Sequence, residues 1–368
     1  MDENLAMMWL TRSLGLNLKK VKHLLSVCQR AEQVYAMTAG QLRHLAGVDE
    51  TMVSALEKGK QILPAWQKEM EQAKVRYLSV YDPAFPQWLR EVYQPPVGLY
   101  VRGTFPCQQE QAISMIGARR CSRYGKDVAH QTAQALAKDG FWIVSGMAEG
   151  IDSICHEGAL DAGGNTIAVL GFGHNRCYPA SKRALMERIA GQGAVISEYP
   201  PNHPAGKYTF PQRNRIIAGL SSGLIVVEAG KHSGTMITVD FALDAGRTVM
   251  AFPSNVTSRF GEGTNHLIQQ GCPIITCMED IYIELGHAPH LQTSKQEKPE
   301  KQDEQTDLSP QEMQVLQALG EEEIAVELLR EKTDLPMAQL KSVLTMLEIY
   351  GQVERLPQER YRKIRMMR

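Results

Sequence analysis

Between residues 112 and 277, short apolar stretches alternate with longer segments whose apolar side chains recur every three or four positions. The short stretches are rich in β-branched residues and bounded by glycine, which is typical of strands buried on both faces of a sheet. Strands are predicted at residues 112–117, 141–146, 165–171, 193–199, 223–229, 247–253 and 273–277. Because strands that alternate with helices form right-handed βαβ units, the pattern predicts an α/β fold with a doubly wound parallel sheet.

The two ends of the chain have other patterns. Residues 1–75 carry apolar side chains at helical spacing, which predicts a helical domain. Residues 295–307 contain no apolar side chain except a proline ring, so this stretch cannot repay its ordering entropy and is interpreted as a linker. The predicted order is a helical domain, a sheet domain, a polar linker and a small C-terminal domain, at residues 1–75, 76–290, 291–307 and 308–368.

The C-terminal domain has the outline of a winged helix. Ser309 and Pro310 are an N-cap and a first helical residue, and two more helices are predicted at 324–333 and 337–351, with a wing at 353–364. The expected recognition helix is poor in basic residues, which disfavours reading of the major groove. Residues 355–368 form a tail with six basic residues and one acidic residue. This basic tail favours a weak auxiliary DNA contact or protein docking, with solvated surface charge as the alternative.

Composition narrows the class of protein. The 368 residues are 43% hydrophobic and 22% charged, which excludes a disordered or collagen-like chain. With 40 basic and 41 acidic residues the net charge is −1, so an anion site must arise from local clustering. The 7 cysteines form no CxxC pair, which favours a reducing compartment. Without a signal-peptide pattern or an apolar run near the ~20 residues of a membrane span, a cytoplasmic protein with no membrane contact is expected.

Three loops that follow predicted strands are basic and contain no carboxylate. Their basic residues are Arg119, Arg120, Arg123, Lys126, Arg176, Lys182, Arg183, Lys207, Arg213 and Arg215. Ligands of a doubly wound sheet bind at the carboxyl ends of its strands, so these loops should converge. A single loop of this kind is more often solvated or tied into surface ion pairs, but three favour an extended polyanion. A fourth loop places Ser233, Gly234 and Thr235 at a helix start, as a cradle for an anion.

No enzyme motif accompanies these loops. The chain lacks GxGxxG, Walker A, HExxH and GxSxG motifs and clustered His/Cys ligands, so no catalytic residue, cofactor or metal is predicted. The carboxylates near the predicted strand ends are Glu149, Asp152, Glu198 and Glu228. A pair of them could carry out acid–base chemistry, but they show no catalytic spacing and are interpreted as helix caps or as partners of the arginines.

Several long stretches resemble the DNA-processing protein A family, DprA/Smf. They include SMIGARRCSRYG, IVSGMAEGID, SEYPP, SGTMIT and, most distinctive, FPQRNRIIAGLSSGLIVVEA at 210–229. The resemblance implies an extended Rossmann-like domain that binds single-stranded DNA and dimerises. It also implies an N-terminal sterile-alpha-motif-like or helix-hairpin-helix-like domain and a C-terminal winged helix. Members of this family load the RecA recombinase onto single strands in natural transformation, and no enzymatic turnover is implied.

The resemblance also implies which residues contact DNA. The family's glycine turn, RNR motif and glycine-hydroxyl turn correspond to residues 117–119, 213–215 and 234–235, with Ala118 where the family has serine. Its basic residue after a tyrosine-proline turn falls at Lys182 or Arg183. The predicted DNA-binding residues are Gly117, Arg119, Arg120, Arg123, Lys182, Arg183, Phe210, Arg213, Asn214, Arg215, Gly234 and Thr235.

Aromatic side chains are interleaved with the basic residues, as in many proteins that bind single strands. They are Tyr124, Phe172, Tyr178, Tyr208 and Phe210. Each could stack on a base, or could instead pack its loop against the domain.

Other functions are compatible with parts of the pattern. Nucleotide phosphoribohydrolases of the LOG type have a related sheet, but their PGGxGTxxE signature is absent and Asp240 stands at the place of its glutamate. A winged-helix transcription regulator would read duplex DNA, which the acidic stretch 321–331 disfavours.

Residues 41–59 have the outline of a helix-hairpin-helix with Asp49 in place of its second glycine, so a protein contact is preferred for the N-terminal domain.

Overall fold

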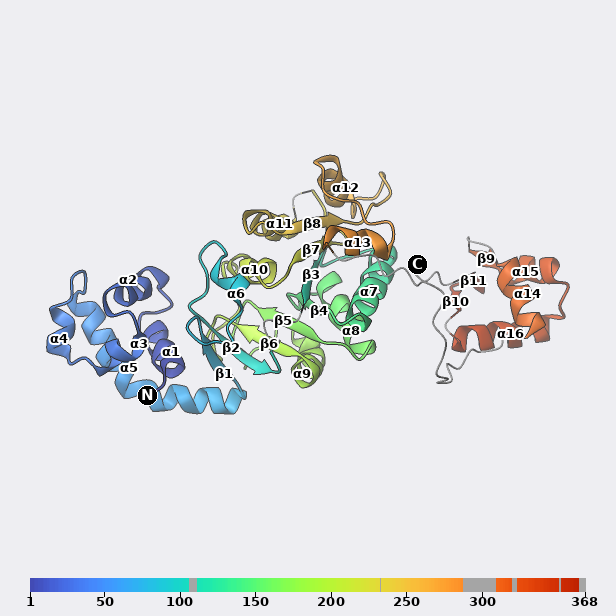
Figure 1. Ribbon diagram of the computed structural model, residues 1–368. Helices are drawn as coiled ribbons and strands as arrows, with labels where there is room; N and C mark the ends of the chain where they lie inside the picture. Colours follow the sequence, from blue (N-terminus) through green and yellow to red (C-terminus); the bar gives the residue numbers. More distant parts are fainter. Residues whose placement is uncertain (106–110, 232, 287–308, 320–322, 351, 364–368) are drawn as a thin grey trace, which may run out of the picture. The chain divides into compact units, whose positions relative to one another are not determined.

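The computed structural model describes residues 1–105, 111–231, 233–286, 309–319, 323–350 and 352–363 (Figure 1). The chain divides into two compact units, Met1–Pro289 and His290–Arg368. The predicted boundary at residue 75 falls inside the first unit and stays a prediction, and the predicted linker lies outside the described residues. None of the described helices is long and apolar enough to span a bilayer.

The first unit contains an eight-stranded sheet with the order β1-β2-β6-β5-β4-β3-β7-β8. The strands are β1 (Arg76–Ser79), β2 (Gly98–Gly103), β3 (Ala112–Ile116), β4 (Trp142–Ser145), β5 (Thr166–Leu170), β6 (Ala194–Ser197), β7 (Gly223–Val226) and β8 (Thr248–Ala251). The strands from β6 to β8 in this order run parallel, which confirms the predicted α/β fold. β1 and β2, which the sequence pattern did not predict, add an antiparallel pair at one edge.

The predicted strand at 273–277 is wrong. The chain makes only an isolated bridge there, between Ala251 and Ile274. The next backbone amides are taken by a helix cap, because those of Thr276 and Cys277 donate to the Asp280 carboxylate at 2.7 and 3.0 Å. The hydrogen bonds of these amides start the helix α13 (Met278–Glu284) and do not extend the sheet.

Helices cover both faces of the sheet (Figure 1). They are α6 (Gln87–Arg90), α7 (Arg123–Lys138), α8 (Ile151–Asp161), η1 (Ala180–Lys182), α9 (Arg183–Gln192), α10 (Thr209–Gly219), α11 (Thr235–Asp244), α12 (Glu262–Gln269) and α13 (Met278–Glu284). The central strand β5 shows the two faces in its alternation. Ile167 and Val169 pack in the core beneath α10 and α11, whereas Ala168 and Leu170 pack against side chains of α8 and α9.

The connections create a switch point in the sheet. From β3 the chain moves through β4 and β5 to β6 on one side, and then returns to place β7 and β8 on the other side of β3. The loops after β3 and β7 therefore leave the sheet in opposite directions. In doubly wound sheets this divergence opens a crevice at the carboxyl ends of the strands, which is where ligands bind.

A buried histidine in α8 gives the first unit a predicted acid sensitivity. The ring of His156 is fully buried, and its Nδ1 donates to Thr166 Oγ1 at 2.6 Å because that hydroxyl itself donates to a carbonyl. Burial lowers the pKa of His156 to about 3, whereas an unfolded histidine titrates near 6.5.

Acidification should therefore destabilise the fold. Below pH 6.5 the unfolded chain binds a proton that the folded chain refuses until about pH 3. We expect His156 to lower the free energy of unfolding by about 1.4 kcal/mol per pH unit in this window. Urea unfolding between pH 7 and 4 measures the slope, and His156→Gln should lessen it by that amount. An unchanged slope in this variant would contradict the assignment.

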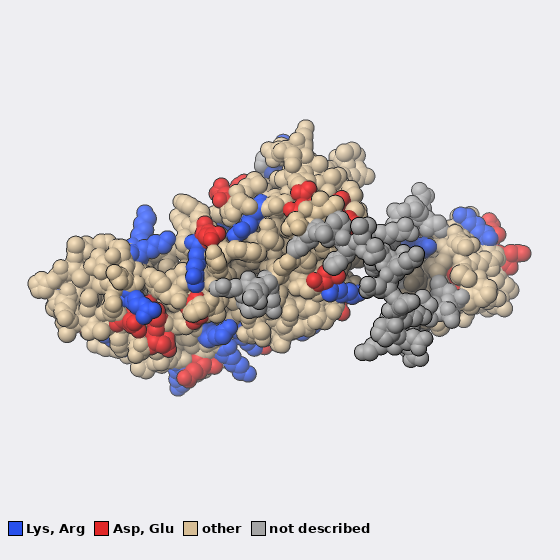
Figure 2. All heavy atoms as spheres, in the orientation of Figure 1, with Lys and Arg blue, Asp and Glu red and all other residues tan. Residues whose placement is uncertain are grey.

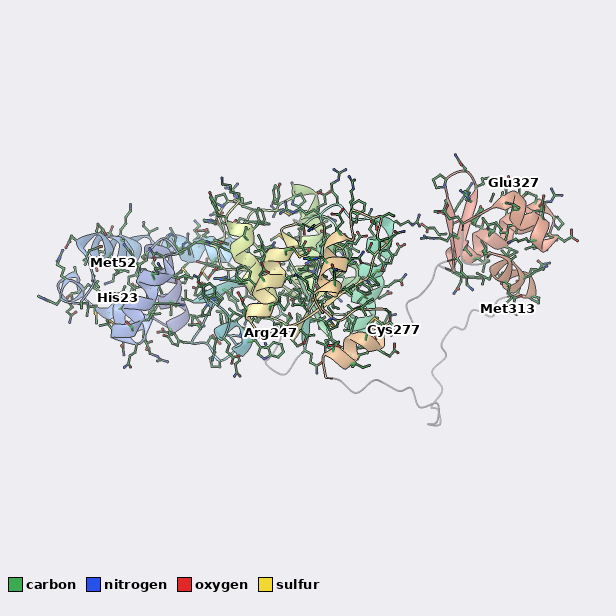
Figure 3. All side chains as sticks on the ribbon, turned by 90° about the horizontal axis from the view of Figure 1, so that it is seen from above. His23, Met52, Arg247, Cys277, Met313 and Glu327 are labelled. Atoms are coloured by element: carbon green, nitrogen blue, oxygen red, sulfur yellow. The ribbon has the colours of Figure 1, made fainter. Side chains whose placement is uncertain are left out.

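The N-terminal part of the first unit is helical, as predicted. Its helices are α1 (Glu3–Ser13), α2 (Leu18–Cys28), α3 (Ala31–Ala36), α4 (Ala39–Arg43) and α5 (Glu50–Ala73). They share one apolar core with Tyr77 and Tyr100 of the edge strands. The hairpin turn at Gly47, with φ +74°, is covered by His23, labelled in Figure 3, whose Nε2 lies 2.7 Å from the Ala46 carbonyl oxygen. The ring occupies the side of the turn where a Cβ on Gly47 would lie.

The second unit has the winged-helix fold that the sequence predicted. It comprises α14 (Pro310–Ala318), β9 (Ile324–Ala325), α15 (Val326–Thr333), α16 (Met337–Ile349), β10 (Val353–Leu356) and β11 (Arg360–Lys363). Ser309 caps α14 in a reciprocal capping box with Glu312, and β10, β11 and β9 form a small sheet. The basic residues of the wing are largely paired, for example Arg362 with Glu354 at 3.2 Å. The rest of the predicted basic tail, from residue 364, lies outside the described residues.

Candidate nucleic-acid interface

A cleft of about 750 Å³ opens at the switch point of the sheet. Its walls are the loops after β3 and β4, the segment before α10 and the first turns of α10 and α11. The predicted DNA-binding residues that line it are Gly117, Arg119, Phe210, Arg213, Asn214, Gly234 and Thr235. The predicted residues that do not line it are Arg120, Arg123, Lys182, Arg183 and Arg215. The structure thus brings three of the four basic or glycine motifs into one cavity.

The loop after β3 is held close to its neighbours. A Cβ on Gly117 would lie 2.7 Å from Ile151 Cγ1 and 2.9 Å from the Glu228 carbonyl oxygen, so only glycine fits without a shift of the backbone. The Ala118 amide donates to the same Glu228 carbonyl at 2.7 Å. These contacts anchor the turn and leave the next side chain, that of Arg119, exposed at the cleft.

Arg213 is buried in the floor of the cleft. Its Nη1 donates to the carbonyl oxygens of Gly146, at 2.7 Å, and of Val169, at the ends of β4 and β5. Its Nε donates to Asn214 Oδ1 at 3.2 Å. Burial lowers the pKa of Arg213 to about 10 and raises the pKa of the nearby Asp152, although the two opposite charges stabilise each other. The guanidinium therefore braces two strand ends through Nη1, while Nε is held by Asn214.

Gly146 makes room for this brace, a role that sequence analysis missed although a glycine directly after a strand was the available signal. A Cβ at Gly146 would lie 2.7 Å from both terminal nitrogens of Arg213. We expect Gly146→Ala to lower the free energy of unfolding by about 1–3 kcal/mol, because the guanidinium must leave its carbonyl partners. Urea unfolding measures the loss. Gly191→Ala is the matched control, because a Cβ there would meet no atom within 4 Å and the backbone is helical, so the free energy of unfolding should not fall.

Arg215 points away from the cleft. Its Nη2 lies 2.7 and 2.8 Å from the two carboxylate oxygens of Glu198, and both side chains are buried. The predicted DNA contact of Arg215 is untested, but its guanidinium is occupied by this carboxylate. Glu198, interpreted from the sequence as a partner of an arginine, has that role.

An aromatic cluster stands at the mouth of the cleft. The ring of Phe210 lies against Phe172, at 6.2 Å between centroids, and against Tyr178, at 5.7 Å. The Arg119 guanidinium lies 5.7 Å from the centroid of Phe210. Phe172 is buried and serves packing, whereas Tyr178 is 54% exposed. Exposed ring faces next to an arginine are suited to unpaired bases.

Two further tyrosines have different surroundings. Tyr208, before α10, is 72% exposed and has the Lys207 ammonium 5.0 Å from its ring centroid. Tyr124 donates its hydroxyl to the Pro253 carbonyl at 2.9 Å and so packs the start of α7 onto the loop after β8. Tyr208 extends the aromatic and basic surface, and Tyr124 holds the fold.

The basic residues outside the cleft lie on exposed or half-exposed surface: Arg120, Arg123, Lys182 and Arg183. Lys182 is 3.3 Å from Glu157, and Arg183 donates to the Asn175 carbonyl at 3.4 Å. Such exposed contacts are weak and can be exchanged for phosphate. In the view of Figure 2, blue and red side chains are interspersed over the first unit, in keeping with its balanced charge.

The helices at this edge of the sheet differ in how they begin. At the start of α7, buried Glu228 accepts hydrogen bonds from the Ser122 amide, at 2.8 Å, and from the Ser122 hydroxyl. In the first turn of α8, Asp152 accepts from the Ala148 amide at 3.4 Å. Glu228 thus holds Ser122, the N-cap of α7, whereas Asp152 makes no cap hydrogen bond to α8 and is instead the charge partner of Arg213. The Glu228 carboxylate therefore occupies the kind of helix start at which a dinucleotide phosphate binds in other doubly wound sheets.

Three other described helices of the first unit begin without any carboxylate at their start. α9, α10 and α11 begin without a side-chain cap and without an acidic residue in the first turn. α10 and α11 begin in the wall of the cleft, the latter at Gly234 and Thr235. The positive end of the helix dipole favours anions at such places.

Comparison with known proteins identifies the family. The profile described as DNA recombination-mediator protein A matches residues 76–286, and the DprA winged helix domain matches residues 298–359. The chain belongs to the DprA/Smf family. Protein Smf of Synechocystis is 32% identical to this chain over 80% of it and 82% of the relative.

Solved structures of DprA agree with the fold. That of Streptococcus pneumoniae DprA has a TM-score of 0.67 at 34% identity and covers 76% of this chain and 97% of its own. That of Helicobacter pylori DprA, described for its single-stranded DNA binding mode, has a TM-score of 0.51 at 27% identity and covers 58% and 97%. The DprA/Smf resemblance predicted from the sequence is thereby confirmed.

The phosphoribohydrolase alternative is not favoured. Asp240, at the place of that family's glutamate, is exposed on α11, whereas Ile237 and Thr238 face the cleft. Among the described residues that line the cleft, Asp152 is the one carboxylate, and it accepts from the Ala148 amide and balances the charge of Arg213.

Proposed function

We propose that this chain binds single-stranded DNA across the cleft at the switch point. The observation that carries the proposal is an exposed arginine, Arg119, that lies over Phe210 beside the open starts of α10 and α11. Phosphates would meet the arginine and the positive ends of the two helix dipoles, and bases would stack on the ring faces of Phe210 and Tyr178. The single-stranded DNA binding described for the Helicobacter pylori relative supports the same function here.

The aromatic cluster favours single strands over duplex. Stacking on a side chain requires a base that is not already stacked and paired, whereas phosphate contacts alone serve both forms. The basic residues outside the cleft, including Lys182 and Arg183, would hold the strand where it leaves the cavity. Arg215 would act on DNA through the helix that it positions, and Arg213 through the strand ends that it braces in the cleft floor.

The first experiment is fluorescence anisotropy with a labelled single strand and a duplex of equal length across a salt series. We expect tighter binding of the single strand, with log K falling by about 0.7 per phosphate contact for each tenfold rise in salt. Equal affinity for both forms would contradict stacking in the cleft. Absence of binding at low salt, with folded protein, would overturn the proposed function.

We further propose that the bound strand is passed to a RecA recombinase and that the chain acts as a homodimer in DNA uptake and recombination, without turnover of its own. The family membership supports this role. RecA filament assembly on a protein-coated single strand, followed with and without this chain, tests the transfer. Light scattering tests the dimer. Unchanged assembly, or a monomer at all concentrations, would contradict the respective part.

A further inference from the structure

A second cavity, of about 510 Å³, lies inside the first unit where the N-terminal helices meet the sheet. Its walls come from the start of α2, the loop after α6, the end of β6 and the outer sides of α10 and α11. Its size is within the range of cavities that hold small ligands. No motif in the sequence indicates it, because its residues come from five separate stretches of the chain.

The cavity adjoins the cleft across α10. Phe210, Arg213 and Asn214 face the cleft, whereas Gln212 and Arg215 face the second cavity. The same division holds on α11, where Ile237 faces the cleft and Phe241, one turn later, faces the cavity. A strand that leaves the cleft over α10 therefore arrives at this cavity.

The cavity is positively charged. Its one carboxylate among the described lining residues, Glu198, is neutralised by Arg215 at 2.7 Å. Lys19 and Lys22 are both exposed in its wall, and neither forms an ion pair with any described residue. They lie in the first turns of α2, which has no acidic residue in its first turn. Two unpaired ammonium groups thus remain for an anion.

The cavity also offers a base-sized platform and an amide. Tyr93 is 63% exposed, and its hydroxyl accepts a hydrogen bond from Gln94 at 3.2 Å, so its ring face is open to a base. Tyr199 donates its hydroxyl to Gln212 Oε1 at 3.0 Å, so the Gln212 amide nitrogen is the end that can donate to a ligand. A base can stack on the tyrosine while its edge meets the amide.

We infer that this cavity is a second nucleotide subsite, which binds a nucleotide of the same single strand after it has crossed α10. The phosphate lies on Lys19 and Lys22, and the base lies on Tyr93. The N-terminal helices thereby contribute directly to DNA binding. The inference rests on the proposed function for the source of the nucleotide, and a free nucleotide has the same chemistry.

The test is the salt dependence of single-strand binding by Lys19→Gln/Lys22→Gln in the full chain. We expect the slope of log K against log salt to decrease by about 0.7, for one lost phosphate contact, with affinity on the order of fivefold lower at 0.1 M salt. Lys20→Gln/Lys58→Gln removes the same charge from α2 and α5 at positions outside the cavity and should leave both values unchanged. Tyr93→Leu should weaken binding at least fivefold, and Tyr93→Phe should restore it.

Isothermal titration with dAMP separates the two sources of nucleotide. If the wild type binds the strand but the lysine variant keeps the full slope and affinity, the subsite is overturned and the proposed function stands. If the wild type binds no strand but binds dAMP in a lysine-dependent way, the cavity is a nucleotide site and the proposed function fails. If it binds neither, both are overturned.

Discussion

Arg213→Ala is expected to lower the free energy of unfolding by about 3–5 kcal/mol and to abolish detectable single-strand binding. The variant removes hydrogen bonds to the ends of β4 and β5 and leaves buried Asp152 without its opposite charge. The loops that line the cleft then lose their anchor. Urea unfolding and anisotropy on the same samples measure the two effects.

A second substitution separates the stability effect from a direct contact with DNA. Arg213→Ala/Asp152→Asn should regain part of the lost stability, because no uncompensated carboxylate remains, while binding stays impaired. The sequence placed Arg213 among the residues that contact DNA, whereas the structure buries it beneath the cleft. Full stability of the single variant would show that the buried pair contributes nothing.

Arg119→Ala is expected to weaken single-strand binding at least tenfold while the free energy of unfolding stays within about 0.5 kcal/mol of the wild type. The side chain is exposed and its contact is with the Phe210 ring, so its removal leaves no buried group unsatisfied. It takes away a charge-assisted phosphate contact, which should also reduce the salt slope by about 0.7. Anisotropy across a salt series provides both numbers.

Arg120→Ala is the matched control for this position. Its side chain is the exposed neighbour that does not line the cleft, so a smaller loss of affinity is expected. Arg119→Lys should give an intermediate affinity, because lysine keeps the charge but not the planar guanidinium over the ring. Equal losses for Arg119→Ala and Arg120→Ala would show that the surface acts by general charge and that the cleft has no special part.

Much of the fold was predictable because its signals are local. The apolar stretch at 223–229 is a central strand in which both faces are buried, and its continuous apolarity reports that fact directly. The edge strand β1 lacks this continuous apolar signal, because its first residue is exposed. It lies at the edge of the sheet and pairs antiparallel with β2. The stretch at 273–277 has the local signal without the strand, because the Asp280 cap takes its amides.

The candidate site was predictable in its location more than in its roles. Strand-end loops of a doubly wound sheet meet at the switch point, so residues 117–119, 213–215 and 234–235 could be brought together on paper. The exposure of each side chain could not be predicted in the same way. Arg213 and Arg215 lie two positions apart on α10, and one turns into the cleft floor while the other turns to Glu198.

The sequence by itself determined the α/β class, the basic strand-end loops, the family and the winged-helix fold, because each is encoded in periodicity or in contiguous motifs. Only the tertiary structure decided which charges are free. Glu228, which follows β7, occupies the start of α7, and Glu198, which follows β6, pairs with Arg215 of α10. The lysines of α2 come near the sheet only because the N-terminal helices pack on β1 and β2. Charge pairing depends on distance in space, which the order of residues along the chain does not contain.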